Sequence, residues 1–196
     1  VSNFAGKTPF AAINLIMPFL MIMGAVGFML GAGGSAIVSR TFGEGDNEKA
    51  CSYFTFLVAF TFLSGIALTI IGELVLPGVA RLLKAEGDLY TYGVKYARIN
   101  LLGVPFWMLQ TMFQTFFITA EKPHLGFIVT VISGVSNMVG DALLVGVCRF
   151  EVAGAAWATI LSQAVGAVIP VIYFARKNGS LLHFCKTRFY GKVLLG

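Results

Sequence analysis

The sequence predicts an all-α protein, a polytopic bundle of membrane-spanning helices. Of its 196 residues, 57% are hydrophobic and only 12% are charged, whereas soluble domains carry about 25% charged residues. The apolar residues gather in five segments, each long enough to cross a hydrocarbon core that takes about 20 helical residues. Strands are not expected, because the segments are too long for barrel strands and an open sheet edge cannot be satisfied in lipid.

Short polar stretches separate the apolar segments and set their bounds. They read RTFGEGDNEK, RLLKAEGD, EKPH and CRFEV. The expected helices cover residues 10–39, 50–78, 92–120, 125–147 and 153–175. We expect a lobe of membrane helices at residues 1–177 and a basic cytoplasmic connector at residues 178–196. A transporter with both ends inside needs a further helix before residue 1, so we interpret the chain as a fragment.

Lysine and arginine residues are divided unevenly between the two sides of the predicted bundle. The richer side receives Arg40, Lys49, Lys122, Arg176, Lys177, Lys186, Arg188 and Lys192. The other side receives Lys7, Arg81, Lys84 and Arg149, with Lys95 and Arg98 near the start of the third helix. Since cytoplasmic loops are enriched in Lys and Arg, the chain is expected to begin outside the cell and to end inside.

Several function classes lack their signatures in this sequence. The net charge is +5, but no basic patch is interleaved with aromatic residues as in a nucleic-acid interface. The spacing of Cys51, Cys148 and Cys185 predicts neither a disulfide framework nor a metal knuckle. No HExxH, GxSxG or P-loop motif is present, so no enzyme activity and no cofactor are expected.

A glycine-rich stretch at residues 24–40 allows two interpretations. The run GAGGSA matches GxGxxA, a turn that binds a dinucleotide when it follows a short strand. Here about twenty apolar helical residues precede it instead. The alternative is a packing stripe of small residues spaced three and four apart, which lets membrane helices approach closely. The stripe consists of Gly24, Gly27, Gly31 and Gly34.

One acidic residue lies well inside a predicted helix. Asp141 occurs in ISGVSNMVGDALLVGV, and Asn137 precedes it by one helical turn on the same face. An ionisable residue within a membrane helix is costly and marks function by default. The two side chains offer oxygens to a hard cation such as Na⁺, and a buried Asp can bind a proton instead. Asn137 could also serve only to hydrogen-bond a neighbouring helix.

Two further helices carry polar residues at helical spacing. In GAAWATILSQ, Thr159 and Gln163 share a face, and Thr159 could either complete the oxygen cage around Asp141 or bond its own helix. In the third helix, Gln110 and Gln114 share a face. They could line a substrate cavity with Gln163 and Met112, or form hydrogen bonds between helices. Methionine and aromatic walls suit varied ligands.

Several stretches together resemble the multidrug and toxin extrusion (MATE) transporters. These are SRTFGEGDNEKA at residues 39–50, YARI followed by GVP, the EKP turn, NxxxD at Asn137 and Asp141, and VAGAAWATILSQ at residues 152–163. The resemblance implies twelve helices in two six-helix lobes, with this chain as the N-terminal lobe without its first helix. It also implies a cation site of Asn137, Asp141 and Thr159, with the Ala155 carbonyl as a plausible addition.

The resemblance implies antiport in a multi-pass protein of the plasma membrane, most naturally a bacterial inner membrane. Na⁺ or H⁺ would enter while an amphipathic, often cationic drug or toxin leaves. Expected partners are therefore small molecules, the lipid bilayer and the second lobe of the same polypeptide, and not nucleic acid. The alternative within the same superfamily is a flippase of lipid-linked oligosaccharides, for which more Lys and Arg would be expected along the cavity.

Overall fold

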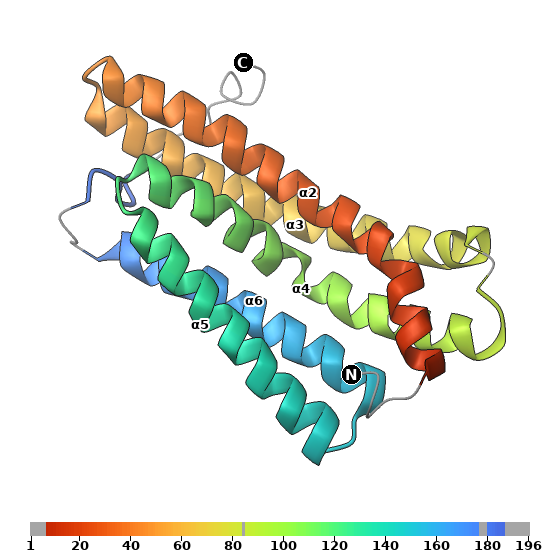
Figure 1. The fold of residues 1–196 in the computed structure, drawn as a ribbon. Helices are drawn as coiled ribbons and strands as arrows, with labels where there is room; N and C mark the ends of the chain where they lie inside the picture. The colour runs from red at the N-terminus through yellow and green to blue at the C-terminus, as the bar shows by residue number, and fades with distance from the viewer. Residues whose placement is uncertain (1–6, 84, 177–179, 187–196) are drawn as a thin grey trace.

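The computed structural model describes residues 7–83, 85–176 and 180–186, and these form a bundle of long helices (Figure 1). The elements are α2 (Lys7–Gly43), α3 (Asn47–Leu82), α4 (Gly87–Thr119), α5 (Pro123–Asp141), the π-helical segment η1 (Ala142–Val147) and α6 (Glu151–Ala175). The described residues include no strand. The predicted all-α class is confirmed, and each expected helix is present with ends that differ by a few residues.

Local chemistry explains where several helices begin. Gly45 has φ +85° in the turn between α2 and α3, a conformation that side chains with a Cβ rarely adopt. Asp46 follows it and caps α3, its side chain accepting a hydrogen bond from the Lys49 backbone N–H at 3.1 Å. Pro123 begins α5, where a missing N–H costs nothing because the first turn has no partner for it.

Helix α4 lies at the centre of the bundle and packs against α2, α3, α5 and α6 (Figure 1). Its buried face joins two apolar clusters. In one of them the ring of Phe54 on α3 lies 4.9 Å from Phe116 on α4 and 5.0 Å from Phe174 on α6. All three rings are fully buried. Edge-to-face aromatic contacts of this kind fix the mutual orientation of helices beyond what burial alone provides.

Helix α2 approaches α4 along its glycines. A Cβ built on Gly27 would lie 2.5 Å from the Met108 Cα, and one built on Gly31 would lie 2.8 Å from the Met112 Cα. Gly24 faces the Trp107 ring in the same way. The dinucleotide interpretation of GAGGSA is excluded, because the run lies inside the continuous helix α2 with no strand before it.

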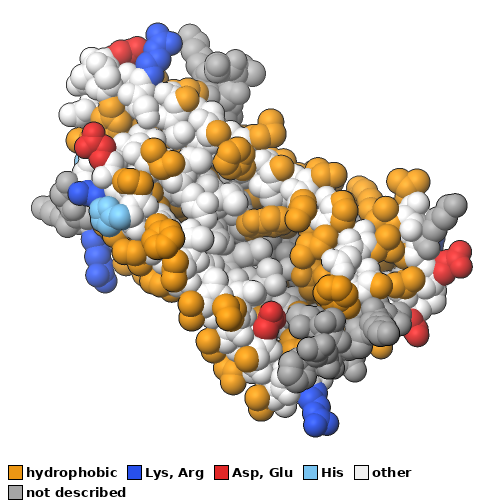
Figure 2. Space-filling model, viewed as in Figure 1, with side chains coloured by type: hydrophobic (Ala, Val, Ile, Leu, Met, Phe, Trp, Pro, Cys, Tyr) orange, Lys and Arg blue, Asp and Glu red, His pale blue; other side chains and the backbone are white. Residues whose placement is uncertain are grey.

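The outer faces of the helices are strongly apolar. Large exposed hydrophobic side chains occur along α2, α3, α5 and α6, among them Met29, Leu74, Phe127 and Leu161. In Figure 2 hydrophobic side chains follow the helices, and most visible charged side chains lie near the helix ends. Five helices are long and apolar enough to cross a membrane. Such surfaces are unfavourable in water over so large an area and suit contact with lipid.

The described part of the predicted connector, residues 180–186, packs onto the bundle. Leu182 is fully buried, and the Phe184 ring stacks on Phe54 at 5.3 Å. The Phe184 backbone N–H also donates to the Phe174 carbonyl at 3.2 Å. The expected boundary at residue 177 lies outside the described residues. Residues 180–186 are therefore attached to α3 and α6 rather than extending away from them.

Candidate functional site

Asp141 is the last residue of α5, directly before the π-helical segment. Its Oδ1 atom is buried and has no hydrogen-bond partner among the described residues. The π register is visible just beyond it, where the Cys148 N–H donates to the Leu143 carbonyl five residues earlier at 2.8 Å. π-Helical turns inside α-helices are rare and are frequent at functional sites. A buried carboxylate oxygen without a partner is equally unusual and marks a place where a cation or proton would be stabilised.

Asn137 lies one turn before Asp141 and lines a cavity of about 460 Å³ between α4, α5 and α6. Thr159 and Gln163 of α6 line the same cavity. Helices α5 and α6 pack closely beside the site. A Cβ built on Gly140 of α5 would lie only 3.0 Å from the Ala158 Cβ of α6. Asn137 of α5 and Thr159 of α6 therefore line the same cavity, and Asp141 lies one helical turn beyond Asn137 and outside that lining.

Thr159 donates its hydroxyl proton to the Ala155 carbonyl at 2.9 Å. This is the bond within its own helix that the sequence left open as an alternative. It does not remove Thr159 as a ligand, because a hydroxyl that donates its proton keeps both oxygen lone pairs free to accept or to bind a cation. The Ala155 carbonyl also keeps a second lone pair.

Two residues of α4 join this site that the sequence interpretation had not assigned to it. Tyr96 is 4% exposed and lies one helical turn before Asn100 on α4. Asn100 is also buried and donates to the Tyr96 carbonyl at 3.0 Å. Both residues line a second cavity of about 220 Å³, which shares Thr159 and Gln163 with the first. Their spacing of four residues was a signal that could have identified them.

The predicted cavity residues of α4 both line the larger cavity and form hydrogen bonds between helices. Gln110 donates to the Ser133 hydroxyl at 3.1 Å, and Ser133 donates in turn to the Ser162 carbonyl at 2.7 Å. Gln114 donates to the Thr130 hydroxyl at 3.3 Å. The two glutamines thus have both predicted roles. Each amide forms a hydrogen bond to α5, and each residue also lines the cavity.

Gln163 lines both cavities and faces α4. A Cβ built on Gly103 would lie 2.8 Å from the Gln163 Oε1, so the amide lies close against the α4 backbone at this position. That oxygen is buried without a hydrogen-bond partner among the described residues. With Asp141 Oδ1, it gives this region two buried oxygens that remain free to bind a donor or a cation.

Met112 does not line this cavity and lies elsewhere. It is fully buried against Gly31 of α2. Residues two apart on a helix point about 200° from each other, so Met112 faces away from Gln110 and Gln114. Met108, Phe113 and Phe116 are also fully buried in the core. Of the expected aromatic and methionine wall on α4, Trp107 is the residue that lines the cavities.

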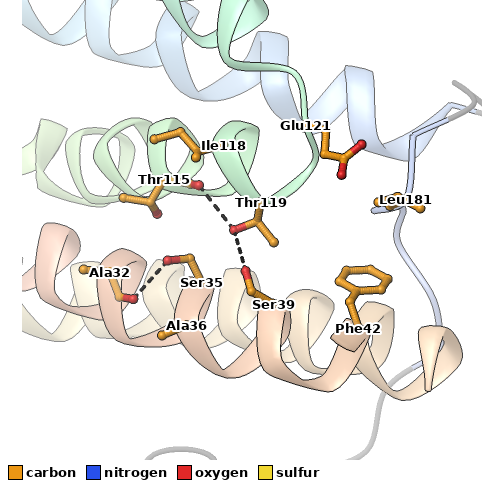
Figure 3. A pocket seen from close by; sticks show the side chains of 10 residues that line it. All are labelled: Ala32, Ser35, Ala36, Ser39, Phe42, Thr115, Ile118, Thr119, Glu121 and Leu181. Carbon is orange, nitrogen blue, oxygen red and sulfur yellow. Dashed lines mark hydrogen bonds between the residues drawn. The ribbon is translucent and has the colours of Figure 1, made fainter. Parts of the chain in front are cut away.

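A third cavity, of about 560 Å³, opens between the ends of α2 and α4 (Figure 3). Small side chains of α2 form one wall, and Thr115 and Thr119 of α4 form the other. The Ser39 hydroxyl donates to the Thr119 hydroxyl at 3.3 Å across it. No pattern in the sequence indicated this opening.

Glu73 and Arg98 are paired between α3 and α4, with Arg98 Nε 3.5 Å from Glu73 Oε2. Both side chains are partly exposed. A pair of this kind contributes little to stability. It does place both charges at the bundle surface, away from the residues that line the two polar cavities.

Comparisons with known proteins show similarity to multidrug export proteins. A family model described as MatE matches residues 1–143. The multidrug export protein MepA of Staphylococcus haemolyticus is 29% identical over 171 residues, covering 87% of this chain and 38% of its own length. The probable multidrug resistance protein YoeA of Bacillus subtilis is 26% identical over 193 residues, covering 95% of this chain and 41% of that protein.

Solved structures show the same fold at low sequence identity. A MATE crystal structure in the bent conformation aligns over 99% of this chain and 44% of that chain, with a TM-score of 0.92 and 23% identity. An inward-facing multidrug resistance MATE transporter aligns with a TM-score of 0.90, at 22% identity, over 96% of this chain and 43% of that chain. The chain therefore spans less than half the length of the relatives that it matches.

Proposed function

Because the chain belongs to the MatE family of multidrug and toxin extrusion transporters, we propose that it forms the N-terminal lobe of a cation-coupled multidrug antiporter. Members of this family are transporters rather than enzymes, and the chain is a multi-pass membrane protein. The proposal includes a second lobe on the same polypeptide and a further helix before residue 1. Coverage of 38% of MepA supports a longer polypeptide that includes the second lobe. The bacterial relatives favour the plasma membrane as the location.

The observation that carries the proposal is the buried Oδ1 atom of Asp141, which has no hydrogen-bond partner among the described residues. A charged carboxylate in this position is costly unless a counter-charge is present. Binding of Na⁺ or H⁺ would remove that cost. Asn137, Thr159 and the Ala155 carbonyl are oxygen donors, which suits a hard cation such as Na⁺. The same carboxylate also suits a proton, so either cation fits this site.

Coupling then follows from competition between two states of the lobe. Neutralising Asp141 favours the state in which α5 and α6 close around it, and charged Asp141 favours a state with a wetter cavity. A drug that binds the second state more tightly is released when the cation binds. Exchange requires only that the two ligands favour different states. The π-helical turn beside Asp141 is a natural position for the change, since its hydrogen-bond register can revert to α-helix.

We assign substrate contact to the polar cavity between α4, α5 and α6. Gln110, Gln114 and Gln163 offer amide groups, and Trp107 offers an aromatic face. Aromatic faces attract cationic ligands. Amide oxygens accept hydrogen bonds from ammonium groups. This chemistry suits amphipathic, cationic drugs. The described lining of the two polar cavities includes no Lys or Arg, which favours antiport over the flippase, whose pyrophosphate substrate needs cationic partners.

Dye efflux from proteoliposomes tests the proposal and identifies the cation. The full-length protein is reconstituted, loaded with a fluorescent cationic drug, and exposed to an imposed Na⁺ gradient or an imposed pH gradient. We expect one of the two gradients to drive efflux in the wild type. Asp141→Asn should lose gradient-driven efflux because an amide stays neutral whether or not a cation is present.

Asp88→Asn is the matched control, because Asp88 is an exposed aspartate in the first turn of α4 and should not affect coupling. The protein amount and its thermal stability in detergent are compared for all three proteins. Efflux driven at the wild-type rate by either gradient in the Asp141→Asn variant would refute the assignment of Asp141. Efflux that neither gradient drives in the wild type would refute antiport itself.

A further inference from the structure

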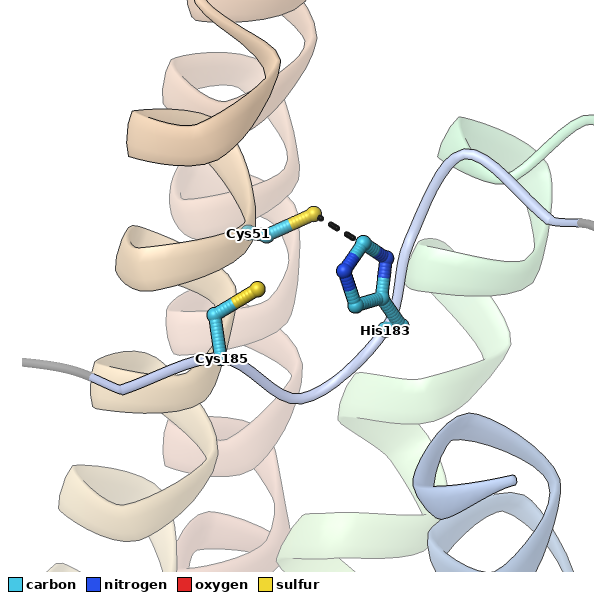
Figure 4. Close-up of side chains that lie close together, drawn as sticks. All are labelled: Cys51, His183 and Cys185. Carbon is cyan, nitrogen blue, oxygen red and sulfur yellow. Dashed lines mark hydrogen bonds between the residues drawn. The ribbon is translucent and has the colours of Figure 1, made fainter. Parts of the chain in front are cut away.

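Three metal-binding side chains converge where residues 180–186 pack against the start of α3. The Cys51 and Cys185 sulfurs and a His183 ring nitrogen all lie within 4.8 Å of one another. Both sulfurs point toward the imidazole, with Cys51 Sγ 3.6 Å from His183 Nδ1 (Figure 4). The spacing of the cysteines did not predict a metal site, because 134 positions separate Cys51 from Cys185 and only the fold brings them together.

Several contacts hold this cluster in place. The Cys185 N–H donates to the Thr55 hydroxyl at 3.0 Å, and the Ser52 hydroxyl donates to the Lys186 carbonyl at 3.2 Å. The buried side chain of Leu182 and the Phe184 ring on Phe54 anchor the two sides of His183. The segment that carries two of the three ligands is therefore fixed to α3 by residues that do not themselves bind a metal.

The ligand set matches a soft or borderline cation. In tetrahedral zinc sites, with Zn–S about 2.3 Å and Zn–N about 2.0 Å, neighbouring ligand atoms lie about 3.5–3.8 Å apart. The observed separations therefore require movements of an ångström or less at the side-chain ends. Cys51 is buried and His183 is exposed. The cluster is thus closed on the protein side and accessible from solvent, which leaves a fourth position for water.

The position of the cluster also suits a metal ion. Glu48 lies three residues before Cys51, in the first turn of α3. The cluster lies at the polar end of α3 near Asp46 and Glu48, and not along its apolar length. A metal there would not have to enter the hydrocarbon region of the membrane.

We propose that Cys51, His183 and Cys185 bind one Zn²⁺ ion, with water in the fourth position. On binding, two S–Zn bonds and one N–Zn bond form, and the two thiol protons pass to solvent. The bound ion clips residues 180–186 to the N-terminal end of α3. Because those residues follow α6, the clip restrains the chain where it leaves the lobe and stabilises the folded lobe. This inference is independent of the transport proposal.

Cobalt binding to the full-length protein, purified in detergent with a phosphine reductant, tests the proposal. Co²⁺ occupies zinc sites and gives thiolate-to-metal charge-transfer bands. We expect one equivalent of Co²⁺ per chain to produce these bands, and Zn²⁺ to displace it. Cys51→Ser and Cys185→Ser should each lose intensity in the bands, and His183→Ala should bind more weakly. The chain offers matched controls in Cys148→Ser and His124→Ala, which should retain wild-type spectra.

Alkylation of the wild-type protein gives a second measurement that needs no variant. Zn²⁺ should protect the half-exposed Cys185 from iodoacetamide, as read by peptide mass spectrometry, while the exposed Cys148 reacts equally with and without metal. Equal alkylation of Cys185 in both conditions would overturn the proposal. So would bands that persist in both cysteine variants. The proposal would also be overturned if the reduced protein bound no metal and the oxidised protein formed a Cys51–Cys185 disulfide. That result would assign the two cysteines a redox role.

Discussion

At the scale of single residues, helical spacing predicted a polar face on α5, and its role as a cation site stays a prediction. Asn137 and Asp141 are four apart on α5, and Ser133 continues the same face one turn earlier, although the sequence interpretation did not include it. Tyr96 and Asn100 have the same spacing on α4 and were also missed. A polar pair at helical spacing indicates a shared face, but it does not say which neighbouring helix that face meets. That information came only from the packing of α4 against α6.

The Thr159 hydroxyl should contribute to cation affinity as an oxygen ligand. Thr159→Val keeps the shape of the side chain and removes that oxygen, so the affinity for the coupling cation should fall roughly tenfold, the effect of about 1.4 kcal/mol. Thr159→Ser keeps the oxygen and should retain most of the affinity. The measurement is the cation concentration that half-saturates drug efflux in proteoliposomes.

Equal half-saturation in wild type and Thr159→Val would show that Thr159 only bonds the Ala155 carbonyl of its own helix. Equal losses in the valine and serine variants would instead indicate a packing role. The two substitutions therefore distinguish a ligand from a structural residue.

At the scale of helices, the existence and order of the elements followed from the sequence, but the exact helix ends and one change of register did not. The second helix was expected to end near residue 78 and instead continues through Pro77 to Leu82. The fourth segment was expected to be one helix and instead changes to π register after Asp141. Hydropathy reports where a chain can cross a membrane, and it carries no information about which carbonyl each N–H reaches.

The glycine face of α2 predicts a difference between two alanine substitutions. Gly27→Ala should destabilise the protein by about 1–3 kcal/mol, as overpacking does, because its Cβ would lie 2.5 Å from the Met108 backbone. Gly33→Ala on the same helix has no atom within 4 Å of its Cβ. It should be neutral or stabilise by up to about 1 kcal/mol through helix propensity. Thermal unfolding in detergent, followed by size-exclusion fluorescence, measures both.

If both alanine variants unfold at the same temperature, the close approach of α2 to α4 is not a feature of the folded lobe in the membrane. If Gly27→Ala is stable but does not transport, the face serves the movement of α2 rather than its packing. We propose that it serves both, since a surface without side chains permits close contact and sliding.

At the scale of the whole molecule, contacts between residues far apart in the sequence bring together groups that the sequence alone did not predict to be neighbours. The sequence predicted a cytoplasmic connector at residues 178–196, and its described residues 180–186 pack on α3 and α6. The cluster of Cys51, His183 and Cys185 exists only because of that packing. Residue spacing predicts which side chains share one face of a helix. Contacts between residues more than a hundred positions apart depend on the assembled fold.

The distribution of Lys and Arg predicts the orientation of the whole bundle. Cys148 is exposed between η1 and α6, on the side expected to face the exterior. A membrane-impermeant maleimide should therefore label Cys148 in intact cells, and Cys148→Ser should abolish that labelling. Combined with Cys148→Ser, Glu44→Cys in the turn between α2 and α3 should be labelled only after permeabilisation. The reverse pattern would invert the orientation.

The coupling role of Asp141 is tested most directly at equilibrium, by the affinity of the full-length protein for a fluorescent cationic drug. The affinity is measured with the coupling cation absent and then saturating. Linkage predicts that the cation weakens drug binding in the wild type by about fivefold or more. Asp141→Asn should bind the drug with one affinity in both conditions. An Asp141→Asn variant whose drug affinity still responds to the cation as in the wild type would contradict the account.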